Sequence, residues 1–472
     1  MNLPADFISS IRPLLGNETE SFLSALSGDA SVSFRLNPAK AVRNHMEPVI
    51  PLNRVPWSQW GFYPEERPAF TFDPLFHAGC YYVQEASSMF VEHVVKECVT
   101  EPAVCLDLCA APGGKSISLL SALPEESLLV SNELIRQRAR VLSETISKFG
   151  HPNVVVTNNK TKDFSAFPHL FDLVLVDAPC SGEGMFRKDE TAVEEWSTQN
   201  VEMCAVRQRD ILNDVWPALK PGGLLIYSTC TYNTSENEEN AIWIARELGA
   251  EFVKVEIDSS WGISSSFDNR LTGYRFFPHK SRGEGLFITM LRKAEAGVGE
   301  TTAGEKRARN KNKKNPSSFM KDRAAYIHLL RHPDFFSFME EDNHIAALPV
   351  GYAEVITMLG RHLKIVSKGI ELGERKGSNF IPSHSLAMSR ELHFDAFPLF
   401  EISYEKAISY LRREAIILTD APKGYLILTY KGEPLGFVKN IGNRANNLYP
   451  HEWRIRSGYL PEKRGDIFTP HP

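Results

Sequence analysis

Stretches of apolar residues alternate with helical patterns through the middle of this chain. Short apolar stretches typical of buried strands cover residues 103–108, 127–133, 154–158, 172–177 and 224–231. Between them, apolar residues recur with a helical period at residues 115–122, 135–149 and 201–218. This alternation predicts a parallel α/β sheet with helices on both faces. Residues 251–257 and 285–291 also look like strands and are expected to complete this doubly wound sheet.

The predicted last helix of this region begins with a recognisable signal. Residues 234–238 read Thr-Ser-Glu-Asn-Glu, with Ser235 followed three residues later by Glu238. This spacing is that of a capping box, in which the two side chains satisfy free N–H groups at a helix start. We therefore expect Ser235 to cap a helix that ends at Leu248.

Smaller domains are predicted on both sides of the sheet region. The first part begins with a helical pattern, continues with a strand at 31–38 and turns helical after Gln84. Near the other end, two strands are predicted around Lys431-Gly432-Glu433-Pro434, as in a small β-barrel. We expect the domain boundaries 1–98, 99–293, 294–317 as a linker, 318–395 and 396–472.

Composition limits the class of protein. With 472 residues, 43% hydrophobic and 24% charged, the chain is typical of a soluble protein of several domains. No apolar run is long enough to span a membrane, and the start MNLPADFISS lacks a signal pattern, so we expect a cytoplasmic protein. Seven cysteines without a CxxC pair argue against a disulfide framework and a structural metal site.

The net charge of -5 means that a nucleic-acid partner would need clustered Lys and Arg. Six of the nine residues from Lys306 to Lys314 are basic, which predicts a solvated linker or an arm on a phosphate backbone. Two other clusters mix aromatic and basic residues, which can stack on bases or pack a core. They are Trp57, Trp60, Phe62 and Tyr63 with Arg35 and Lys40, and Tyr449 and Trp453 with Arg444, Arg454 and Arg456.

Candidate reactive groups lie where predicted strands end. Asp177 and Cys180 follow the strand at 172–177, and Cys230 lies at the end of the strand at 224–231. Open α/β sheets bind ligands at the carboxyl ends of their strands. A single Cys on a buried strand is usually an inert apolar residue. Two cysteines at the ends of neighbouring strands beside an acid instead indicate a reactive site.

The sequence LDLCAAPGGKS, residues 106–116, predicts a cofactor loop between strand and helix. Its glycines let the backbone approach a ligand, and the following helix offers unpaired N–H groups. Residue 109 is Cys where a phosphate loop needs Gly, and G-x-G-x-x-G is absent from this stretch. Glu133 ends the next strand, where an acid accepts hydrogen bonds from ribose hydroxyls. A ribose-bearing cofactor fits this pattern.

Four motifs carry a family resemblance: LDLCAAPGGKS, the Asn-Glu pair 132–133, DAPCSGEGMFRK and YSTCTYNTSENE. They resemble the S-adenosylmethionine motifs and the paired Pro-Cys and Thr-Cys motifs of RNA (cytosine-5) methyltransferases, the NOL1/NOP2/Sun family. HAGCYYVQEASSM, EGMFRKD, NNLYP and EWRI resemble a bacterial branch that methylates 16S ribosomal RNA.

The resemblance implies a Rossmann-like methyltransferase core, a small N-terminal α+β domain and a C-terminal PUA-like RNA-binding region rich in β-strands. It implies S-adenosylmethionine as cofactor and RNA, 16S rRNA or the small ribosomal subunit, as partner. We expect a monomer that binds no metal and no membrane.

The resemblance also implies roles for individual residues. Cys230 is expected to add to carbon 6 of cytosine, Cys180 to assist release of the proton on carbon 5, and Asp177 to contact ring nitrogen N3. Lys115 is expected to cap the cofactor loop and Glu133 to hold the ribose, with Asp177 bordering the cofactor. The backbone that cradles the methionine part is expected to be Cys109, Ala110, Ala111, Pro112, Gly113 and Gly114.

One position departs from the family, and alternatives stay open. An acid usually meets the adenine after the third strand, but this chain has Lys160 there, and Asp163 is the possible substitute. A methyltransferase of exocyclic amines would have an aromatic residue in place of Cys180. An assembly factor without activity would be expected to have lost one of the site residues. Methylation of tRNA or of another rRNA is a further alternative.

Overall fold

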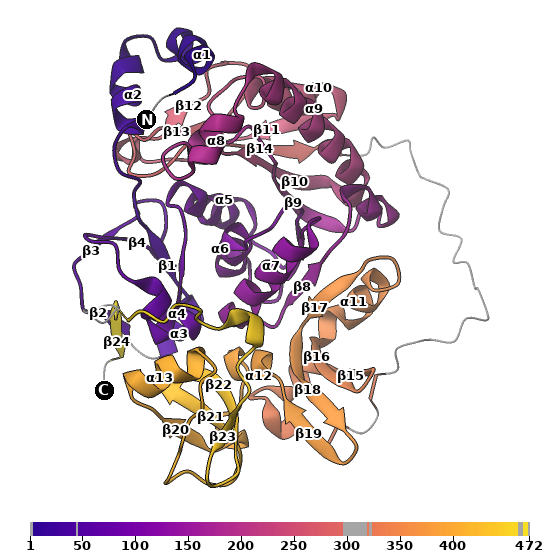
Figure 1. Ribbon diagram of the computed structural model, residues 1–472. Helices are drawn as coiled ribbons and strands as arrows, with labels where there is room; N and C mark the ends of the chain where they lie inside the picture. Colours follow the sequence, from indigo (N-terminus) through magenta and orange to yellow (C-terminus); the bar gives the residue numbers. More distant parts are fainter. Residues whose placement is uncertain (1–2, 44–45, 296–318, 321–322, 461–465, 471–472) are drawn as a thin grey trace, which may run out of the picture.

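A ten-stranded sheet forms the centre of the molecule, with strand order β12-β13-β14-β10-β9-β6-β7-β8-β17 and β11 paired to β14 (Figure 1). The computed structural model describes residues 3–43, 46–295, 319–320, 323–460 and 466–470. The basic run Lys306–Lys314 lies outside these described residues. The strands are β6 (Val104–Asp107), β7 (Leu128–Asn132), β8 (Val154–Thr157), β9 (Phe171–Asp177), β10 (Leu219–Thr229), β11 (Ala250–Val253), β12 (Ser264–Ser265), β13 (Tyr274–Phe276), β14 (Leu286–Lys293) and β17 (Ile365–Lys368).

The middle of this sheet is parallel, as the sequence pattern predicts. β6 pairs in parallel with both β7 and β9, β7 pairs with β8, and β9 pairs with β10. From β6 the chain first adds β7 and β8 on one side of this strand and then β9 and β10 on the other. This reversal of strand order creates a crevice at the carboxyl ends of β6 and β9. The five predicted strands of this region are confirmed.

Helices cover both faces of the sheet. One face packs against α5 (Phe90–Cys98), α6 (Gly114–Ala122) and α7 (Arg136–Phe149), and the other against α9 (Thr198–Val215) and α10 (Glu238–Glu247). Apolar residues at helical spacing, such as Leu142 and Ile146 of α7, form the buried face of each helix. The short helix α8 (Glu190–Glu195) follows the Pro-Cys motif.

Both edges of the sheet are antiparallel. On one side β14 pairs with β10, and β11, β13 and β12 continue the sheet beyond it; the strand-like stretches 251–257 and 285–291 predict β11 and β14. At the other edge, β17 pairs with β8, with Ile365 opposite Thr157. This strand comes from the C-terminal half of the chain, and the sequence pattern does not predict its position.

The N-terminal region packs on the sheet domain in two places. α1 (Ala5–Leu15) and α2 (Thr19–Leu26) share a core with residues that follow the Pro-Cys and Thr-Cys motifs, including Phe186 and Tyr232. A four-stranded sheet of order β3-β4-β1-β5 lies beyond them. Its elements are β1 (Phe34–Leu36), α3 (Pro38–Arg43), β2 (Met46–Pro48), β3 (Leu52–Arg54), β4 (Gly61–Pro64), α4 (Pro74–His77) and β5 (Tyr81–Val83).

The aromatic cluster of this region packs a core. Trp57 and Tyr63 are buried, and the Trp57 indole donates to the carbonyl of Ala86 at 2.7 Å. Arg35 and Lys40 are buried too, and Arg35 pairs with Glu92 at 3.1 Å. Base stacking by these buried members is therefore wrong, and the core-packing alternative is confirmed for them.

The C-terminal region contains two four-stranded sheets, β15-β16-β18-β19 and β20-β21-β22-β23. The predicted strand pair is confirmed, because Lys431 and Gly432 take the positive φ values of a tight turn between β21 and β22. The elements are β15 (Phe336–Glu341), β16 (His344–Pro349), α11 (Ala353–Leu359), β18 (Ile370–Lys376), β19 (Asn379–Pro382), α12 (His384–Met388), β20 (Leu399–Glu401), α13 (Tyr404–Leu411), β21 (Gly424–Tyr430), β22 (Glu433–Asn440), β23 (Ala445–Asn447) and β24 (Phe468–Pro470).

The two ends of the chain share one core. Phe34 and Tyr81 of the N-terminal sheet pack with Tyr410, Leu428 and other residues of the C-terminal region. β2 also pairs with β24 (Figure 1). Tyr449 is completely buried in this core, so its predicted contact with RNA is wrong. Among the helices of the described ranges, none has both the length and the apolar character to span a bilayer.

Candidate active site

The sheet brings the two motif cysteines together. β9 and β10 are neighbours, and Asp177 at the end of β9 lies in register with Ser228 of β10. The loops that follow these strands carry Cys180 and Cys230, whose sulfur atoms are 3.0 Å apart. The expectation that the two cysteines follow neighbouring strands is confirmed, and β6, which precedes the predicted cofactor loop, adjoins β9 on its other side.

Asp177 connects the cysteine pair to the cofactor loop. Its Oδ2 accepts a hydrogen bond from Nζ of Lys115 at 2.9 Å, and its Oδ1 accepts one from the Ser228 hydroxyl at 2.8 Å. Burial disfavours the charged ammonium of Lys115, but the carboxylate of Asp177 outweighs burial and raises its pKa above the ordinary value. Lys115 therefore carries a positive charge at physiological pH, and Cys230 interacts with it electrostatically.

The two cysteines are not equivalent. The hydrogen bond to the sulfur of Cys230, together with burial, raises the pKa of Cys180 well above its ordinary range. Cys180 is therefore a neutral thiol at physiological pH and can donate its S–H toward Cys230. Of the two sulfurs, that of Cys230 is then the better candidate for the nucleophile.

Two buried carboxylates hold the cysteine loops in place. Glu183, from the Pro-Cys loop, accepts hydrogen bonds from the backbone N–H groups of Tyr232 at 2.7 Å and Asn233 at 3.0 Å. Glu236, from the Thr-Cys loop, accepts one from the N–H of Ser181 at 3.1 Å. The amide of Asn233 donates to both carboxylates, at 3.0 Å to Glu183 and 2.8 Å to Glu236. Each cysteine loop is thus fixed by a carboxylate from the other.

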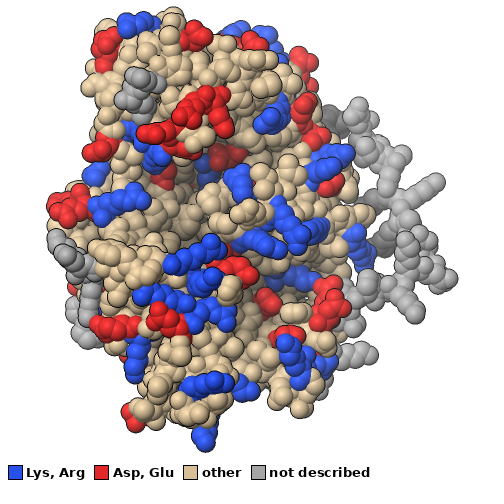
Figure 2. Space-filling view, viewed as in Figure 1, with Lys and Arg blue, Asp and Glu red and all other residues tan. Residues whose placement is uncertain are grey.

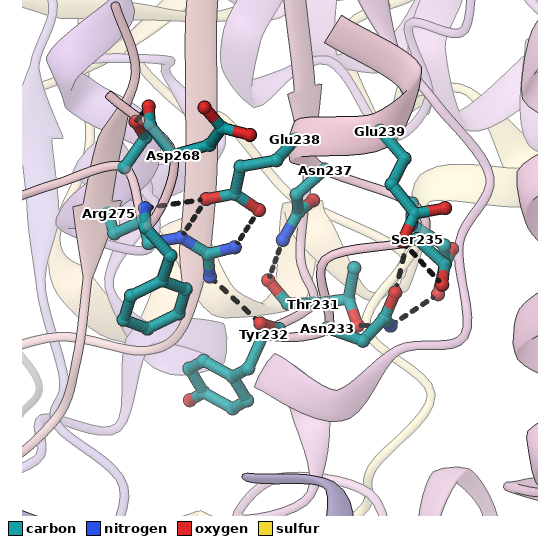
Figure 3. Close-up of polar contacts among 12 residues, drawn as sticks. Thr231, Tyr232, Asn233, Ser235, Asn237, Glu238, Glu239, Asp268 and Arg275 are labelled. Atoms are coloured by element: carbon teal, nitrogen blue, oxygen red, sulfur yellow. Dashed lines mark hydrogen bonds and ion pairs between the residues drawn. The ribbon is translucent and has the colours of Figure 1, made fainter. Parts of the chain in front are cut away.

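The start of α10 differs from the predicted capping box (Figure 3). The helix begins at Glu238 after Asn237, and the hydroxyl of Ser235 donates to the side chain of Glu239 at 3.4 Å. Glu238 forms a buried ion pair with Arg275 of β13 instead of reaching back to the helix start. Ser235 as helix cap is therefore wrong, because a distant strand supplies a stronger partner for Glu238.

Arg275 also fixes the Thr-Cys loop. Its guanidinium donates to the carbonyl of Tyr232 at 2.8 Å, in addition to the pair with Glu238 (Figure 3). The side chain of Asn237 donates to the carbonyl of Thr231 at 3.0 Å. Sequence reasoning missed both residues, although a lone Arg within the apolar strand β13 was a visible signal.

The predicted cofactor loop joins β6 to α6 and contains Cys109, Ala110, Ala111, Pro112, Gly113 and Gly114. Gly113 adopts a φ of 118°, and a Cβ there would lie 2.8 Å from the methyl carbon of Thr145. Only glycine fits this position without displacing α7. The N–H of Ala110 donates to the carbonyl of Asn132 at 2.8 Å, which ties the loop to the end of β7.

Glu133 and Arg138 form the ribose side of the predicted site. Glu133 is buried, and its carboxylate accepts a hydrogen bond from the N–H of Ile135 at 2.8 Å. Arg138 of α7 pairs with Glu133 at 3.4 Å and donates to the carbonyl of Ala111 at 2.8 Å. Arg138 therefore links the cofactor loop to the ribose acid, a contact that the sequence reasoning missed.

Asp107 is a further acid at the carboxyl end of β6 that the sequence reasoning missed. Its Oδ2 accepts a hydrogen bond from the Ser116 hydroxyl at 2.7 Å, while Oδ1 has no partner among the described residues. Burial raises the pKa of Asp107 to about 7. A free carboxylate oxygen beside a glycine loop suits the polar methionine part of S-adenosylmethionine, so the residues present fit this cofactor. The signal was the only charged residue of the stretch AVCLDL.

The position that departs from the family, Lys160, lies at the surface. Lys160 is exposed, and its backbone N–H donates to the carboxylate of Asp163 at 3.0 Å. Asp163 thus caps the short helix η4 (Thr161–Ala166). Substitution for the missing acid by Asp163 stays a prediction.

Comparison with known protein families matches three parts of the chain. Residues 98–292 match the family described as "16S rRNA methyltransferase RsmB/F". Residues 3–86 match the N-terminal domain of 16S rRNA methyltransferase RsmF, and residues 397–455 match the RsmF PUA domain.

Individual relatives are similar along nearly the whole chain. Ribosomal RNA small subunit methyltransferase F of Salmonella heidelberg is 30% identical over 483 residues, with 97% of each chain covered. That of Erwinia tasmaniensis is 31% identical over 476 residues, covering 97% of this chain and 98% of the relative. NSun6 from Pyrococcus horikoshii with SFG has a similar fold, with a TM-score of 0.52 and 20% identity over 62% of this chain and 99% of that chain.

A doubly wound sheet with this cofactor loop defines an S-adenosylmethionine-dependent methyltransferase. Because the chain is 30% identical to the Salmonella heidelberg enzyme over 97% of its length, it belongs to the RsmB/F family of 16S rRNA methyltransferases. Its N-terminal and PUA matches are those of RsmF. The family resemblance, the fold class and the cofactor predicted from sequence are confirmed.

Proposed function

We propose that this protein transfers a methyl group from S-adenosylmethionine to carbon 5 of a cytidine in 16S ribosomal RNA. The observation that carries this proposal is the 3.0 Å contact between the sulfurs of Cys180 and Cys230. Two thiols at one point suit a reaction that forms and then breaks a bond between sulfur and the base. Membership of the RsmB/F family supports 16S rRNA as the substrate.

Cys230 acts as the nucleophile in this scheme. Carbon 5 of cytosine is a poor nucleophile until a thiolate adds to carbon 6 and makes carbon 5 enamine-like. The Lys115 ammonium interacts electrostatically with Cys230, which brings a positive charge to the cysteine pair. Asp177, at the end of the neighbouring strand, contacts ring nitrogen N3 and so assists the addition.

Cys180 acts in the release step. It takes the proton from carbon 5, the double bond between carbons 5 and 6 re-forms, and the carbon–sulfur electron pair returns to Cys230. In the free protein, the sulfur of Cys230 holds the pKa of Cys180 high. Once that sulfur is bonded to carbon 6, its hydrogen bond to Cys180 is lost and burial alone is the main cause that remains, so Cys180 releases its own proton to solvent water and then takes the proton from carbon 5.

S-adenosylmethionine, when bound, supplies a methyl group on a positively charged sulfur. We expect the backbone of residues 109–114 to hold its methionine part and Glu133 to accept hydrogen bonds from its ribose. Arg138 keeps these two parts of the site together. Asp177 borders the predicted cofactor loop, because its carboxylate accepts a hydrogen bond from Lys115 at the end of that loop.

We further propose that one chain is sufficient for the reaction, without a metal. The cysteines, Asp177 and the cofactor loop all come from the same chain. Within the described ranges, His, Cys, Asp and Glu side chains do not gather in a group that could hold a metal ion. Because the relatives are bacterial rRNA enzymes, we expect the cytoplasm to be the place of action.

The test is to identify the methylated atom. Purified protein is incubated with 16S rRNA and S-adenosylmethionine carrying a deuterated methyl group, and the RNA is digested to nucleosides for mass spectrometry. We expect labelled 5-methylcytidine, and none with the Cys230→Ala variant. Labelled 4-methylcytidine, or no labelled cytidine at all with the wild-type protein, would contradict the proposal.

A further inference from the structure

Unpaired cations gather at the edge of the sheet beyond the predicted cofactor site. They are Arg136 and Arg140 of α7, Lys160 and Lys162 after β8, and Arg361 and Lys364 before β17. All are exposed, and the described part of the chain supplies none of these side chains with an ion-pair or hydrogen-bond partner. We call these six residues the cationic surface. Figure 2 shows Lys and Arg side chains across the middle of the face on which α7 lies in Figure 1.

Hydrogen bonds lock the three segments of the cationic surface together. The side chain of Asn159 binds the backbone of Lys364 twice, as acceptor from its N–H at 2.9 Å and as donor to its carbonyl at 3.2 Å. Asn158 donates from its side chain to the carbonyls of Glu133 at 2.8 Å and Leu134 at 2.9 Å, just before α7. The rings of Phe167 and His362 lie 5.6 Å apart, which joins the η4 region to the segment before β17. The cations therefore form one fixed surface.

The acids next to this surface are already engaged. Asp163 caps η4 through the N–H of Lys160, and Asp214 of α9 accepts a hydrogen bond from Thr161 at 2.5 Å. Arg136 and Arg140 are four residues apart on one helix, where like charges repel each other. The neighbouring acids Glu133 and Glu144 pair with Arg138 and Lys148, so the repulsion between the two arginines has no ion pair of its own within the described residues. A bound polyanion would remove it.

We propose that the cationic surface binds the phosphate backbone of the RNA a few nucleotides from the methylated cytidine. β8 lies four strands from β10, which is roughly 19 Å at about 4.8 Å per strand. The surface thus lies near enough to Cys230 for the same RNA strand to contact both. Exposed Leu134 and Ile135, at 58% and 52% exposure, lie beside the cations and offer apolar contact to sugars and bases. The inference rests on the proposed function for its substrate.

This surface comes from both halves of the chain. Lys364 belongs to the C-terminal half, and its backbone holds the loop with Lys160 and Lys162. RNA that binds here bridges the methyltransferase domain and the C-terminal region. Lys160, which stands where the family usually has an acid, acquires a role as a phosphate contact.

The test measures how RNA affinity depends on salt. Binding of 16S rRNA is compared for the wild type, Lys162→Gln/Lys364→Gln, and a control with Arg246→Gln/Lys254→Gln near the opposite edge of the sheet. Each lost phosphate contact on single-stranded RNA lowers the slope of log affinity against log salt by about 0.7. We expect the first variant to lose about 1.4 in slope and the control to match the wild type. Adding Arg140→Gln and Arg361→Gln should double the loss.

Two further readouts distinguish the loss of phosphate contacts from damage to the fold or to the cofactor site. Cofactor affinity and the melting temperature of Lys162→Gln/Lys364→Gln should equal those of the wild type. In the variant that also carries Arg140→Gln, the melting temperature should stay the same or rise, because the repulsion from Arg136 is relieved. A slope equal to that of the wild type and the control would overturn the inference. Methylation of 16S rRNA is measured in the same preparations. If the wild type methylates while the slope is unchanged, only the cationic surface is refuted; if the slope falls without any methylation, only the proposed function is refuted.

Discussion

The carboxylates that hold the cysteine site are buried, and so is the junction between the two chain ends, but different interactions hold the two regions together. At the site, Glu183 and Glu236 receive hydrogen bonds from the opposite cysteine loop. At the junction, Phe34 and its neighbours pack with apolar residues of the C-terminal region in one core. The first region depends on particular donor and acceptor atoms, and the second on volume and shape.

This difference decides which residues each region tolerates. A buried carboxylate must keep all its donors, because every unpaired polar group in a low-dielectric interior is costly. An apolar core accepts other apolar side chains of similar volume with small losses. The cysteine site is therefore recognisable in the sequence as short motifs, whereas the junction gives only a general apolar pattern.

The largest expected effect on stability is at the junction. Phe34→Ala removes a completely buried ring that lies 5.4 Å from Tyr81 and 5.7 Å from Phe468. We expect the free energy of unfolding in urea to fall by about 3 to 5 kcal/mol. Phe62→Ala, which removes a partly exposed ring, should cost clearly less. Equal losses for the two variants would contradict a shared core at this point.

At the cysteine site, a change of one atom should affect the rate. Each oxygen of Glu183 accepts two hydrogen bonds, one pair from the backbone N–H groups of Tyr232 and Asn233 and the other from the side chains of Trp196 and Asn233. Glu183→Gln replaces one of these oxygens with an NH₂ group, so donors lose their acceptor in either orientation of the amide. Displacement of the cysteine loops should lower the methylation rate about tenfold to hundredfold. Glu195→Gln, an exposed neighbour on α8, serves as control and should keep the wild-type rate. Equal methylation rates for the two variants would contradict the role of Glu183 in holding the cysteine loops.

The junction should also respond to acid. Burial, and then the charge of Lys148, lower the pKa of both His77 and His384 to about 3. A lowered pKa in the folded state means that the unfolded chain binds the proton first, so stability is lost as pH falls from about 6.5 toward 3. The expected slope is about 1.4 kcal/mol per pH unit for each histidine. In His384→Phe, thermal denaturation between pH 7 and pH 5 should show a weaker dependence on pH, and an unchanged one would refute this assignment.

The smallest effect is expected where the sequence suggests a cap that the structure lacks. Ser197 is a true cap of α9, because its hydroxyl accepts a hydrogen bond from the N–H of Asn200 at 3.1 Å. Ser197→Ala should cost about 1 kcal/mol of unfolding free energy. Ser235→Ala should cost less than about 0.5 kcal/mol, since Ser235 only meets Glu239. Chemical denaturation of both variants measures the difference, and the reverse order would restore Ser235 as the cap.

The predictable part of the molecule is the part where local chemistry and periodicity agree. The five apolar stretches of the central region form the predicted parallel strands, and Cys180 and Cys230 meet as expected. Their position follows from strand order alone, because the carboxyl ends of parallel strands share one edge.

Contacts between residues far apart in sequence could not be predicted. Glu238 prefers Arg275, which lies 37 residues further along the chain, and this long-range pair replaces the local capping box. Tyr449 and Arg35 look like RNA contacts in the sequence but are buried in cores. A single sequence shows that a residue can stack or pair, but only the packing shows whether it remains at the surface.

The most direct test of the two-cysteine account is the trapping of a covalent complex. Wild type, Cys180→Ala, Cys230→Ala and the double variant are incubated with 16S rRNA and S-adenosylmethionine and separated under denaturing conditions. We predict that a protein–RNA band accumulates in Cys180→Ala, where bond formation proceeds but release fails, and is absent from Cys230→Ala and from the double variant. A band in Cys230→Ala, or methylation by both single variants without any band, would contradict the assignment of Cys230 as nucleophile and Cys180 as the release group.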